Sequence, residues 1–201
     1  MSELDKSTEQ VILRAARKVF TLRGFDGARM QQIADEAGIN KALLHYYFRS
    51  KEKLFDAIFK EVMQLIIPGA VQVLLSDLNF SEKIYGFVEK YLDSLLANPD
   101  VPGFVLHELS LHPERLLDNI KGMGVDFNLL VGQIRREIEL KHIKPVEPDH
   151  FMINLVSLCM FPFLARPVLM GLTGFDHGKF NAFIAERKQE IPRLILQSIL
   201  P

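Results

Sequence analysis

The sequence contains a single cysteine, Cys159, among its 201 residues. One cysteine excludes an intramolecular disulfide and a metal site built from several cysteines. Because Cys159 lies in an apolar stretch, we expect its thiol to pack as a small hydrophobic group in a protein of the reducing cytoplasm. Glycine and proline, at 12 and 10 residues, are too few for a fibrous or low-complexity chain, and 48% hydrophobic residues suffice for a folded core.

Long hydrophobic runs are also scarce. The segment Met1–Lys6 has mixed charge and no apolar core of signal-peptide length, so we expect no export signal. The strongest candidate for a membrane span is 151–172, but its longest uncharged stretch is the 15 residues Phe151–Ala165. A spanning helix needs about 20 apolar residues. We therefore predict a buried helix here and no membrane partner.

Sequence motifs that carry catalysis are missing as well. The chain has no glycine-rich phosphate loop and no Gly-x-Ser-x-Gly elbow, and Gly122-Met123-Gly124 follows no predicted strand. His107 and His112 are five residues apart, which separates them by about 140° around a helix instead of placing them on one face as zinc ligands. We predict that the protein is not an enzyme and uses neither a metal nor a cofactor.

The net charge of −1 hides an uneven distribution. Residues 1–60 contain eleven Lys or Arg and eight Asp or Glu, so the first part of the chain has an excess of three positive charges and the remainder carries −4. A positive excess favours contact with a polyanion. The first part of the chain is therefore the expected nucleic-acid contact.

Helical periodicity runs through most of the chain, and no alternating run is long enough to predict a sheet. Ser7 to Gln10 resembles a capping box, which predicts a first helix from Ser7 until Gly24 ends the pattern. After Ser50, a further helix opens at Lys51, and Pro68-Gly69 should kink or break it. The other predicted helices are 29–37, 41–48, 81–97, 101–111, 114–140, 149–170 and 179–200. The predicted fold is all-α.

The spacing of Ala34, Gly38 and Leu44 meets the steric needs of a helix-turn-helix. Ala34 is small where two helices approach, Gly38 can adopt the positive φ of a tight turn, and Leu44, with Ile39, fills the wedge between the helices. Asn40 is a suitable cap for the second of the two helices. The same spacing also fits an αα-hairpin with no nucleic-acid function, so it leaves both interpretations open.

A wider set of residues resembles the DNA-binding signature of the tetracycline-repressor (TetR) family, from about Ser7 to Phe59. The most specific matches are Ile33-Ala34, Ala37-Gly38-Ile39, Lys41, Leu44, Tyr47-Phe48 and Ser50-Lys51-Glu52. The resemblance implies a three-helix helix-turn-helix head in residues 1–50, joined by a helix over 51–67 to a larger helical bundle. That bundle, residues 51–201, would bind an effector and dimerise through its last two long helices.

Candidate DNA contacts follow from the predicted helix-turn-helix. Lys41 can reach a phosphate or a guanine edge, Leu43 a thymine methyl, and Lys51 a phosphate. His45 and Tyr46 are placed on the groove-facing side, whereas Tyr47 and Phe48 are assigned to packing. The full set of predicted DNA-binding residues is Arg29, Gln31, Asn40, Lys41, Leu43, His45, Tyr46, Arg49 and Lys51.

The predicted effector domain is rich in Phe, Leu, Ile and Met, and most of these side chains should form its core. An apolar cavity with a few polar groups is nonetheless the usual form of a small-molecule site. The candidate pocket residues are Phe87, Tyr91, Phe104, His107, Glu108, Phe127, Asn128, Met160, Phe163 and Arg166. The candidate dimer contacts, on the last two predicted helices, are Phe151, Leu155, Leu158, Phe183, Ile191, Leu194 and Ile195.

These features together favour a cytoplasmic, homodimeric transcriptional regulator. It would be a repressor that leaves a palindromic double-stranded DNA operator when a small apolar or amphipathic molecule binds. The alternative is a helical interaction or adaptor protein without specific DNA binding, and a small helical enzyme is a weaker competitor.

Overall fold

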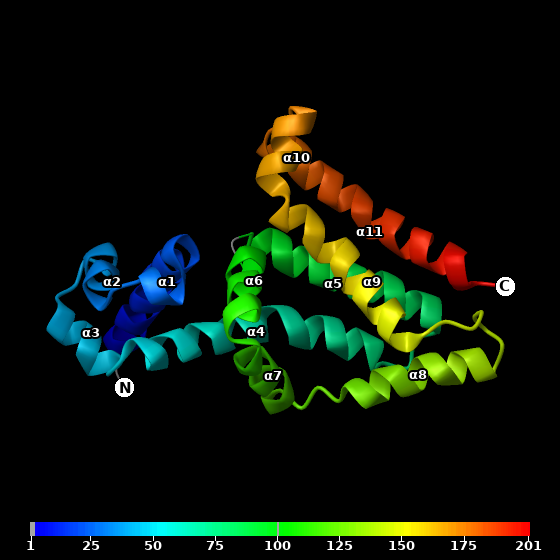
Figure 1. Ribbon diagram of the computed structural model, residues 1–201, viewed down its shortest axis with the longest axis horizontal. Coiled ribbons are helices and arrows are strands. Elements are labelled where there is room, and N and C mark those ends of the chain that lie inside the picture. The colour runs from blue at the N-terminus through cyan, green and yellow to red at the C-terminus, as the bar shows by residue number, and fades with distance from the viewer. Residues whose placement is uncertain (1–2, 100) are drawn as a thin grey trace. The chain divides into compact units, whose positions relative to one another are not determined.

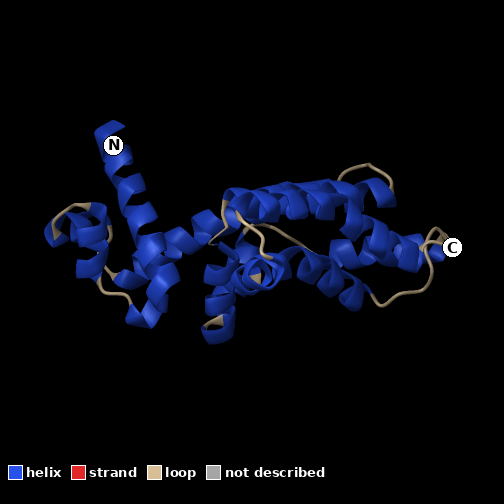
Figure 2. Cartoon of the chain, turned by 90° about the horizontal axis from the view of Figure 1, so that it is seen from above, coloured by secondary structure: helices blue, strands red, loops and turns tan. Residues whose placement is uncertain are grey.

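The computed structural model describes residues 3–99 and 101–201, and every regular element in these ranges is a helix, as Figures 1 and 2 show. The all-α prediction is therefore confirmed. The helices are α1 (Glu3–Gly27), α2 (Met30–Ala37), α3 (Lys41–Tyr47), α4 (Lys51–Leu74), α5 (Phe80–Ala97), α6 (Val101–Leu111), α7 (Pro113–Gly122), α8 (Phe127–Glu139), α9 (Pro148–Leu164), α10 (Arg166–Thr173) and α11 (His177–Ile199).

The chain forms two compact units that are not contiguous in sequence. The first contains the residues up to Gln64 together with Gly103–Asn119, and the second contains Leu65–Pro102 and Ile120–Pro201. The head predicted for residues 1–50 lies within the first unit. An aromatic cluster joins α6 to α4 in that unit: Phe104 of α6 lies 5.2 Å from Phe55 and 5.9 Å from Phe59 of α4, measured between ring centroids.

The first helix departs from its prediction at both ends. It begins by Glu3, so Ser7 lies inside the helix and the predicted capping box does not start it. Gly24, at φ 67° and ψ 174°, breaks the helical conformation as predicted, but the chain resumes a further turn to Gly27. That turn places Phe25 inside the aromatic cluster, with centroids 6.1 Å from Phe20 and 5.1 Å from Phe55.

Helix α4 is continuous through Pro68, so of the kink or break predicted at Pro68-Gly69, the break does not occur. Proline removes one backbone hydrogen bond from a helix interior. Buried side chains on both sides of it, Ile66 before and Ala70 and Leu74 after, keep the helix in register because the same face stays covered.

In the second unit, α5 packs on α11 and α9, and α8 packs on α9. Leu92 of α5, Leu155 of α9 and Phe180 of α11 are fully buried in its core. An ion pair of 2.5 Å between Lys188 Nζ and Asp93 Oδ1 also links α11 to α5. Cys159 is fully buried on α9, as predicted, and burial raises the pKa of its thiol to about 12.

Two long predicted helices of this unit are each divided. The predicted helix 114–140 is split into α7 and α8, because Gly124 takes a φ of 70° and the Asp126 side chain accepts a hydrogen bond from the Asn128 N–H at the start of α8. The predicted helix 149–170 is split into α9 and α10, which are bent by 66°, with Pro167 in the first turn of α10. Proline at a helix start is favoured because its missing N–H has no partner there.

By length and composition, α4 alone or α9 with α10 would be long enough to cross a membrane. The buried residues of α9, among them Phe151, Leu155 and Phe163, explain its apolar character as a core helix. In α4, Leu54, Phe55 and Ile58 are likewise buried. The prediction of a buried helix over 151–172 is confirmed for the α9 part, but α10 has no buried residue, and its Val168 and Leu172 are exposed.

Candidate nucleic-acid interface

A left-handed glycine joins α2 and α3. Gly38 takes φ 67° and ψ 28°, its N–H donates to the Asp35 carbonyl at 3.2 Å, and the Ile39 N–H donates to the Ala34 carbonyl at 3.0 Å. This paired pattern is a Schellman motif, which satisfies the last carbonyls of α2 and turns the chain sharply. Ile33, Ala34 and Leu44 are fully buried beneath the turn. The geometry is that of a helix-turn-helix.

Helix α3 is the candidate reading helix. Its N-terminus is capped by Asn40, whose Oδ1 accepts a hydrogen bond of 2.7 Å from the Leu43 N–H. Leu44 and Phe48 face inward, whereas Lys41, His45 and Tyr46 are exposed, Tyr46 by 78%. The helix is short, its N-terminus is capped, and its buried side packs on the rest of the head. Its polar side can therefore enter the major groove of DNA while that packing stays intact.

The structure places seven of the nine predicted DNA contacts fully on the surface, with Leu43 and Lys51 half-buried. Some of these side chains already have partners within the head. Gln31 Nε2 donates to Asp35 Oδ1 at 2.8 Å, and His45 Nδ1 lies 3.4 Å from the Arg49 carbonyl. Arg29 precedes α2 as its N-cap residue, and its backbone N–H donates to Gln32 Oε1 at 3.1 Å.

Lys51 has an internal role that its sequence position does not reveal. Its Nζ donates to the carbonyls of Phe25 at 2.9 Å and Ala28 at 3.3 Å, and lies 4.3 Å from the centroid of the Phe25 ring. The ammonium group therefore binds the carbonyl end of α1 and joins it to the start of α4. A phosphate contact by this group would compete with these bonds.

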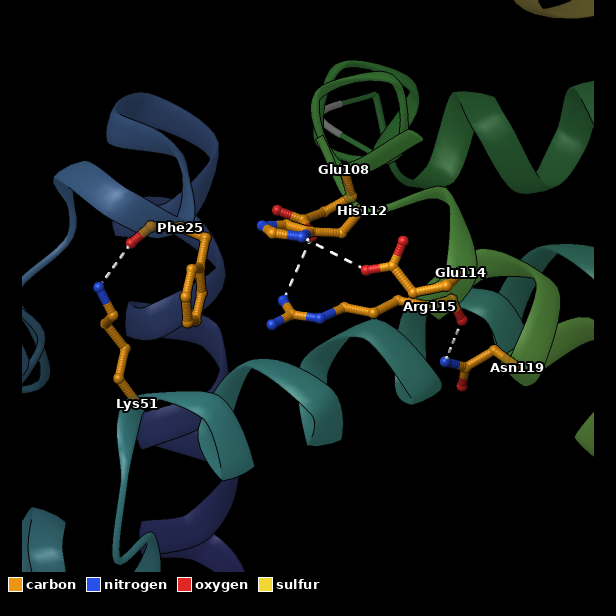
Figure 3. A network of polar contacts seen from close by, with 7 residues as sticks. All are labelled: Phe25, Lys51, Glu108, His112, Glu114, Arg115 and Asn119. Carbon is orange, nitrogen blue, oxygen red and sulfur yellow. Dashed lines mark hydrogen bonds and ion pairs between the residues drawn. The ribbon is translucent and has the colours of Figure 1, made fainter. Parts of the chain in front are cut away.

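A second cation, which the sequence motifs did not indicate, lies on the other side of Phe25. Arg115 of α7 stacks over Phe25 at 4.7 Å and over Phe55 at 5.1 Å, and its Nη1 donates to Glu108 Oε2 at 3.3 Å. Figure 3 shows Lys51 and Arg115 approaching Phe25 from opposite sides. Only long-range packing identifies Arg115, because its sequence neighbourhood is an ordinary amphipathic helix.

Glu108 is the buried charged residue of this cluster, with 1% of its surface exposed. Burial raises the pKa of its carboxyl group, while the positive charges of Arg115, His112 and His107 oppose that shift. Its second oxygen, Oε1, is buried with no hydrogen-bond partner among the described residues. Burying a carboxylate oxygen that accepts no hydrogen bond costs folding free energy, so a function for Glu108 would explain why the group is kept.

The ten predicted pocket residues are divided between the two units. Phe104, His107 and Glu108 belong to the first unit and the other seven to the second. In the second, Phe87 stacks on Tyr91 at 5.4 Å and Phe163 contacts Phe180 at 5.9 Å, as core aromatics do. Burial raises the pKa of Tyr91.

The remaining members of that predicted pocket are scattered. Phe127 and Asn128 are exposed at the start of α8, Met160 is half-buried, and the Arg166 guanidinium lies 4.7 Å from the Phe180 ring centroid. The ten residues remain a predicted effector pocket, and Phe87, Tyr91 and Phe163 also pack as core aromatics.

Four of the predicted dimer contacts are buried within the chain itself: Phe151, Leu155, Ile191 and Ile195. Phe151, for example, packs 5.7 Å from Phe80 of α5. Their place in a dimer interface remains a prediction. Leu158, Phe183 and Leu194 instead line an open surface cavity of 280 Å³ with charged residues of α11.

Taken together, the buried wedge, the capped reading helix and its exposed polar side chains define a helix-turn-helix DNA-binding regulator. Comparison with known proteins extends this assignment. Residues 12–58 match the family described as bacterial regulatory proteins, tetR family. The helix-turn-helix head is therefore similar to that of TetR-family transcriptional regulators.

Similarity to individual relatives extends beyond the head. The chain is 23% identical over 197 residues to the HTH-type transcriptional regulator RutR of Escherichia coli, covering 96% of this chain and 91% of RutR. It is 28% identical over 177 residues to the HTH-type transcriptional repressor NicS of Pseudomonas putida, covering 84% and 82%. The crystal structure of a TetR family transcription regulator from Marinobacter aquaeolei superposes with a TM-score of 0.71 at 20% identity, covering 100% of this chain and 99% of the other.

Proposed function

We propose that the protein is a homodimeric repressor that binds a near-palindromic DNA operator and is released from it by a small apolar or amphipathic molecule. The observation that carries this proposal is α3, whose buried Leu44 fixes the helix while Lys41, His45 and Tyr46 stay exposed. Two such helices in a two-fold dimer would read half-sites roughly 34–36 Å apart, or a multiple of that spacing.

Within this interface, the exposed basic side chains would position the protein on the phosphates, and α3 would read the bases. Lys41, in the first turn of α3, can reach a phosphate or a guanine edge, and Arg29 before α2 and Arg49 after α3 are also exposed. Leu43, half-buried, is the candidate for a thymine methyl. Asn40 uses its Oδ1 as a cap, which leaves its amide N–H groups for DNA.

The repressor role and the apolar effector draw support from relatives. NicS is described as a transcriptional repressor. A structural neighbour with a TM-score of 0.66 is described as the fatty acid degradation regulator FadR from Bacillus halodurans. In this chain, an open cavity of 490 Å³ has a largely apolar lining that includes Pro68 and Val71 of α4, Leu75 directly after it, Met123 and Val125. A DNA-bound regulator of this kind would act in the cytoplasm.

The adaptor alternative is not favoured, because a protein surface evolved for apolar docking would not be expected to expose lysine, histidine and arginine around a capped α3. The decisive experiment is selection of random duplex DNA by the purified protein, followed by sequencing of the retained pool and titration with salt. Recovery of a palindrome supports the regulator. Retention of no sequence above the input pool would support the adaptor.

A matched pair of variants tests the reading helix within the same assay. Lys41→Ala should weaken binding and reduce the slope of log affinity against log salt by about 0.9 if Lys41 neutralises one phosphate. Leu43→Ala should leave the slope unchanged and relax the preference at one base position of each half-site. Unaltered affinity, slope and preference in both variants would remove α3 from the interface.

A further inference from the structure

Three helices of the first unit meet at the Phe25 ring. It comes from the last turn of α1, Lys51 of α4 lies 4.3 Å from its centroid, and Arg115 of α7 lies 4.7 Å from it (Figure 3). Cations over an aromatic face are attracted by the ring's quadrupole, more strongly where water is excluded. Phe25 is 8% exposed, so both contacts are largely shielded.

The position of Arg115 depends on Glu108. The ion pair between Arg115 Nη1 and Glu108 Oε2 spans 3.3 Å, and the Asn119 side chain donates to the Arg115 carbonyl at 2.9 Å. The Arg115 side chain is 23% exposed and Glu108 is 1% exposed. Burial of the carboxylate therefore anchors the guanidinium where it covers both Phe25 and Phe55.

The end of α1 is in turn the support of the reading head. The Phe25 and Ala28 carbonyls bind Lys51, and Ala28 leads directly into Arg29 and α2. A shift of Phe25 would be passed to the first turn of α2 on one side and to the first turn of α4 on the other. Neither Glu108 nor Arg115 is a candidate for DNA contact itself.

We propose that Glu108 and Arg115 are positioning residues for DNA binding: an ionised Glu108 holds Arg115 across Phe25 and Phe55, and loss of that charge loosens the base of the helix-turn-helix and lowers operator affinity. This proposal rests on the proposed function. It assigns a regulatory contact to a buried carboxylate whose Oε1 has no partner among the described residues.

The charged groups around Glu108 determine the direction of the effect. His107 of α6, His112 between α6 and α7, and Arg115 of α7 act on the Glu108 carboxyl group. Lys51 of α4 lies on the other side of Phe25. His112 Nδ1 pairs with Glu114 Oε1 at 3.4 Å, and Glu52 of α4 also senses Arg115. Because burial raises the pKa of Glu108, the carboxyl takes a proton at a higher pH than an exposed glutamate. Operator affinity should therefore fall as the pH is lowered.

The raised pKa of Glu108 affects the free energy of unfolding in the opposite direction to operator affinity. A raised pKa means that the folded state prefers the neutral carboxyl, so this group stabilises the fold at low pH and that contribution is lost as the pH rises through its folded pKa. Glu108→Gln, which mimics the protonated form, should therefore unfold at no lower a denaturant concentration than the natural chain at pH 7. A purely structural role for Glu108 would require stability and affinity to fall together.

The experiment measures operator affinity over a pH series that runs downward from neutral pH, because the raised pKa of Glu108 predicts protonation on that side. It compares the natural chain with Glu108→Gln, Arg115→Met and Arg115→Lys. We expect Glu108→Gln and Arg115→Met to bind the selected operator about tenfold more weakly at pH 7, a typical coupling between sites. Arg115→Lys should recover part of the loss, because it keeps the charge but not the planar stacking. Glu108→Gln should also lose the pH dependence.

His45→Gln is measured alongside, because His45 lies on the exposed side of α3 and its own effect on DNA binding must be separated from that of Glu108. Natural affinity and an unchanged pH profile in both Glu108→Gln and Arg115→Met would overturn the proposal. A second arm measures amide hydrogen exchange of residues 25–30 without DNA, where Glu108→Gln should exchange faster than the natural chain. If the natural chain selects no DNA, the proposed function fails. Equal amide exchange of residues 25–30 in the natural chain and in Glu108→Gln would separately refute the link between Glu108 and the head.

Discussion

At the scale of single residues, the cation Lys51 shows how one side chain can serve folding instead of the contact that its motif suggests. Its ammonium group bridges two carbonyls at the end of α1 and one aromatic ring. Hydrogen bonds from a charged donor are stronger than neutral ones, and they lose less to solvent when the group is half-buried. The base of the reading head is thus held by charge as well as by apolar packing.

Replacement of Lys51 separates these roles. Lys51→Ala should lower the free energy of unfolding by about 2 kcal/mol, since it leaves the Phe25 and Ala28 carbonyls without their charged donor. Lys53→Ala, at an exposed position two residues on, should change it by less than about 0.5 kcal/mol. Denaturant unfolding measures both values. A phosphate role for Lys51 would instead appear as a reduced salt slope of DNA binding with stability intact.

At the scale of helices, two glycines in the left-handed region carry different constraints. Gly38 ends α2 with open space around the position of a Cβ atom, so only its backbone conformation demands glycine. Gly24 combines φ 67° with ψ 174°, a region almost restricted to glycine, and a Cβ there would lie 2.2 Å from Nε2 of His107. The kink in α1 and the path of α6 are therefore coupled through Gly24.

Replacing each of the two glycines by alanine should therefore lower the free energy of unfolding by different amounts. Gly38→Ala should destabilise the protein by about 1 kcal/mol, the cost of a left-handed alanine. Gly24→Ala should cost about 3 kcal/mol or more, because it adds a steric clash to the strain. His107→Ala in the Gly24→Ala background should recover part of that loss in thermal or denaturant unfolding. Equal costs for the two glycine substitutions would show that His107 moves aside freely.

At the scale of the whole molecule, apolar side chains remain exposed on the helices proposed to form the dimer. Ile153 and Phe161 of α9 are 65% and 63% exposed, and Leu194 of α11 is 58% exposed. Exposed apolar residues grouped on neighbouring helices are typical of a protein interface. The surface cavity lined by Leu158, Phe183 and Leu194 lies on the same two helices.

A charged residue at this surface should prevent assembly. Leu194→Glu is expected to convert a particle of twice 23.0 kDa into one of 23.0 kDa in light scattering, because two-fold symmetry places the added charge at the interface twice. Leu129→Glu, at a 55% exposed leucine of α8, is the control and should leave the mass unchanged. A dimer that survives Leu194→Glu would move the interface away from α11.

The local sequence determined most of the helices and the helix-turn-helix, because periodicity, the glycine at 38 and the cap at Asn40 act over a few residues. It also indicated the exposed side of α3, since the burial of Leu44 leaves Lys41 and His45 outward. The sequence pattern misplaced helix ends at three points. At Pro68, packing keeps α4 continuous, and at 122–126 and 165–167, turn residues divide two long predicted helices.

Only the tertiary structure decided which apolar residues are core and which remain on the surface, because periodicity marks a face without naming its partner. It buried Phe151, Leu155, Ile191 and Ile195 and left Leu194 exposed, although all five lie on the helices predicted to dimerise. It also joined Gly103–Asn119 to the reading head and brought Arg115 and Glu108 to Phe25, across some 90 residues of chain. Contacts of that separation depend on the packing of whole helices, which no local pattern of residues encodes.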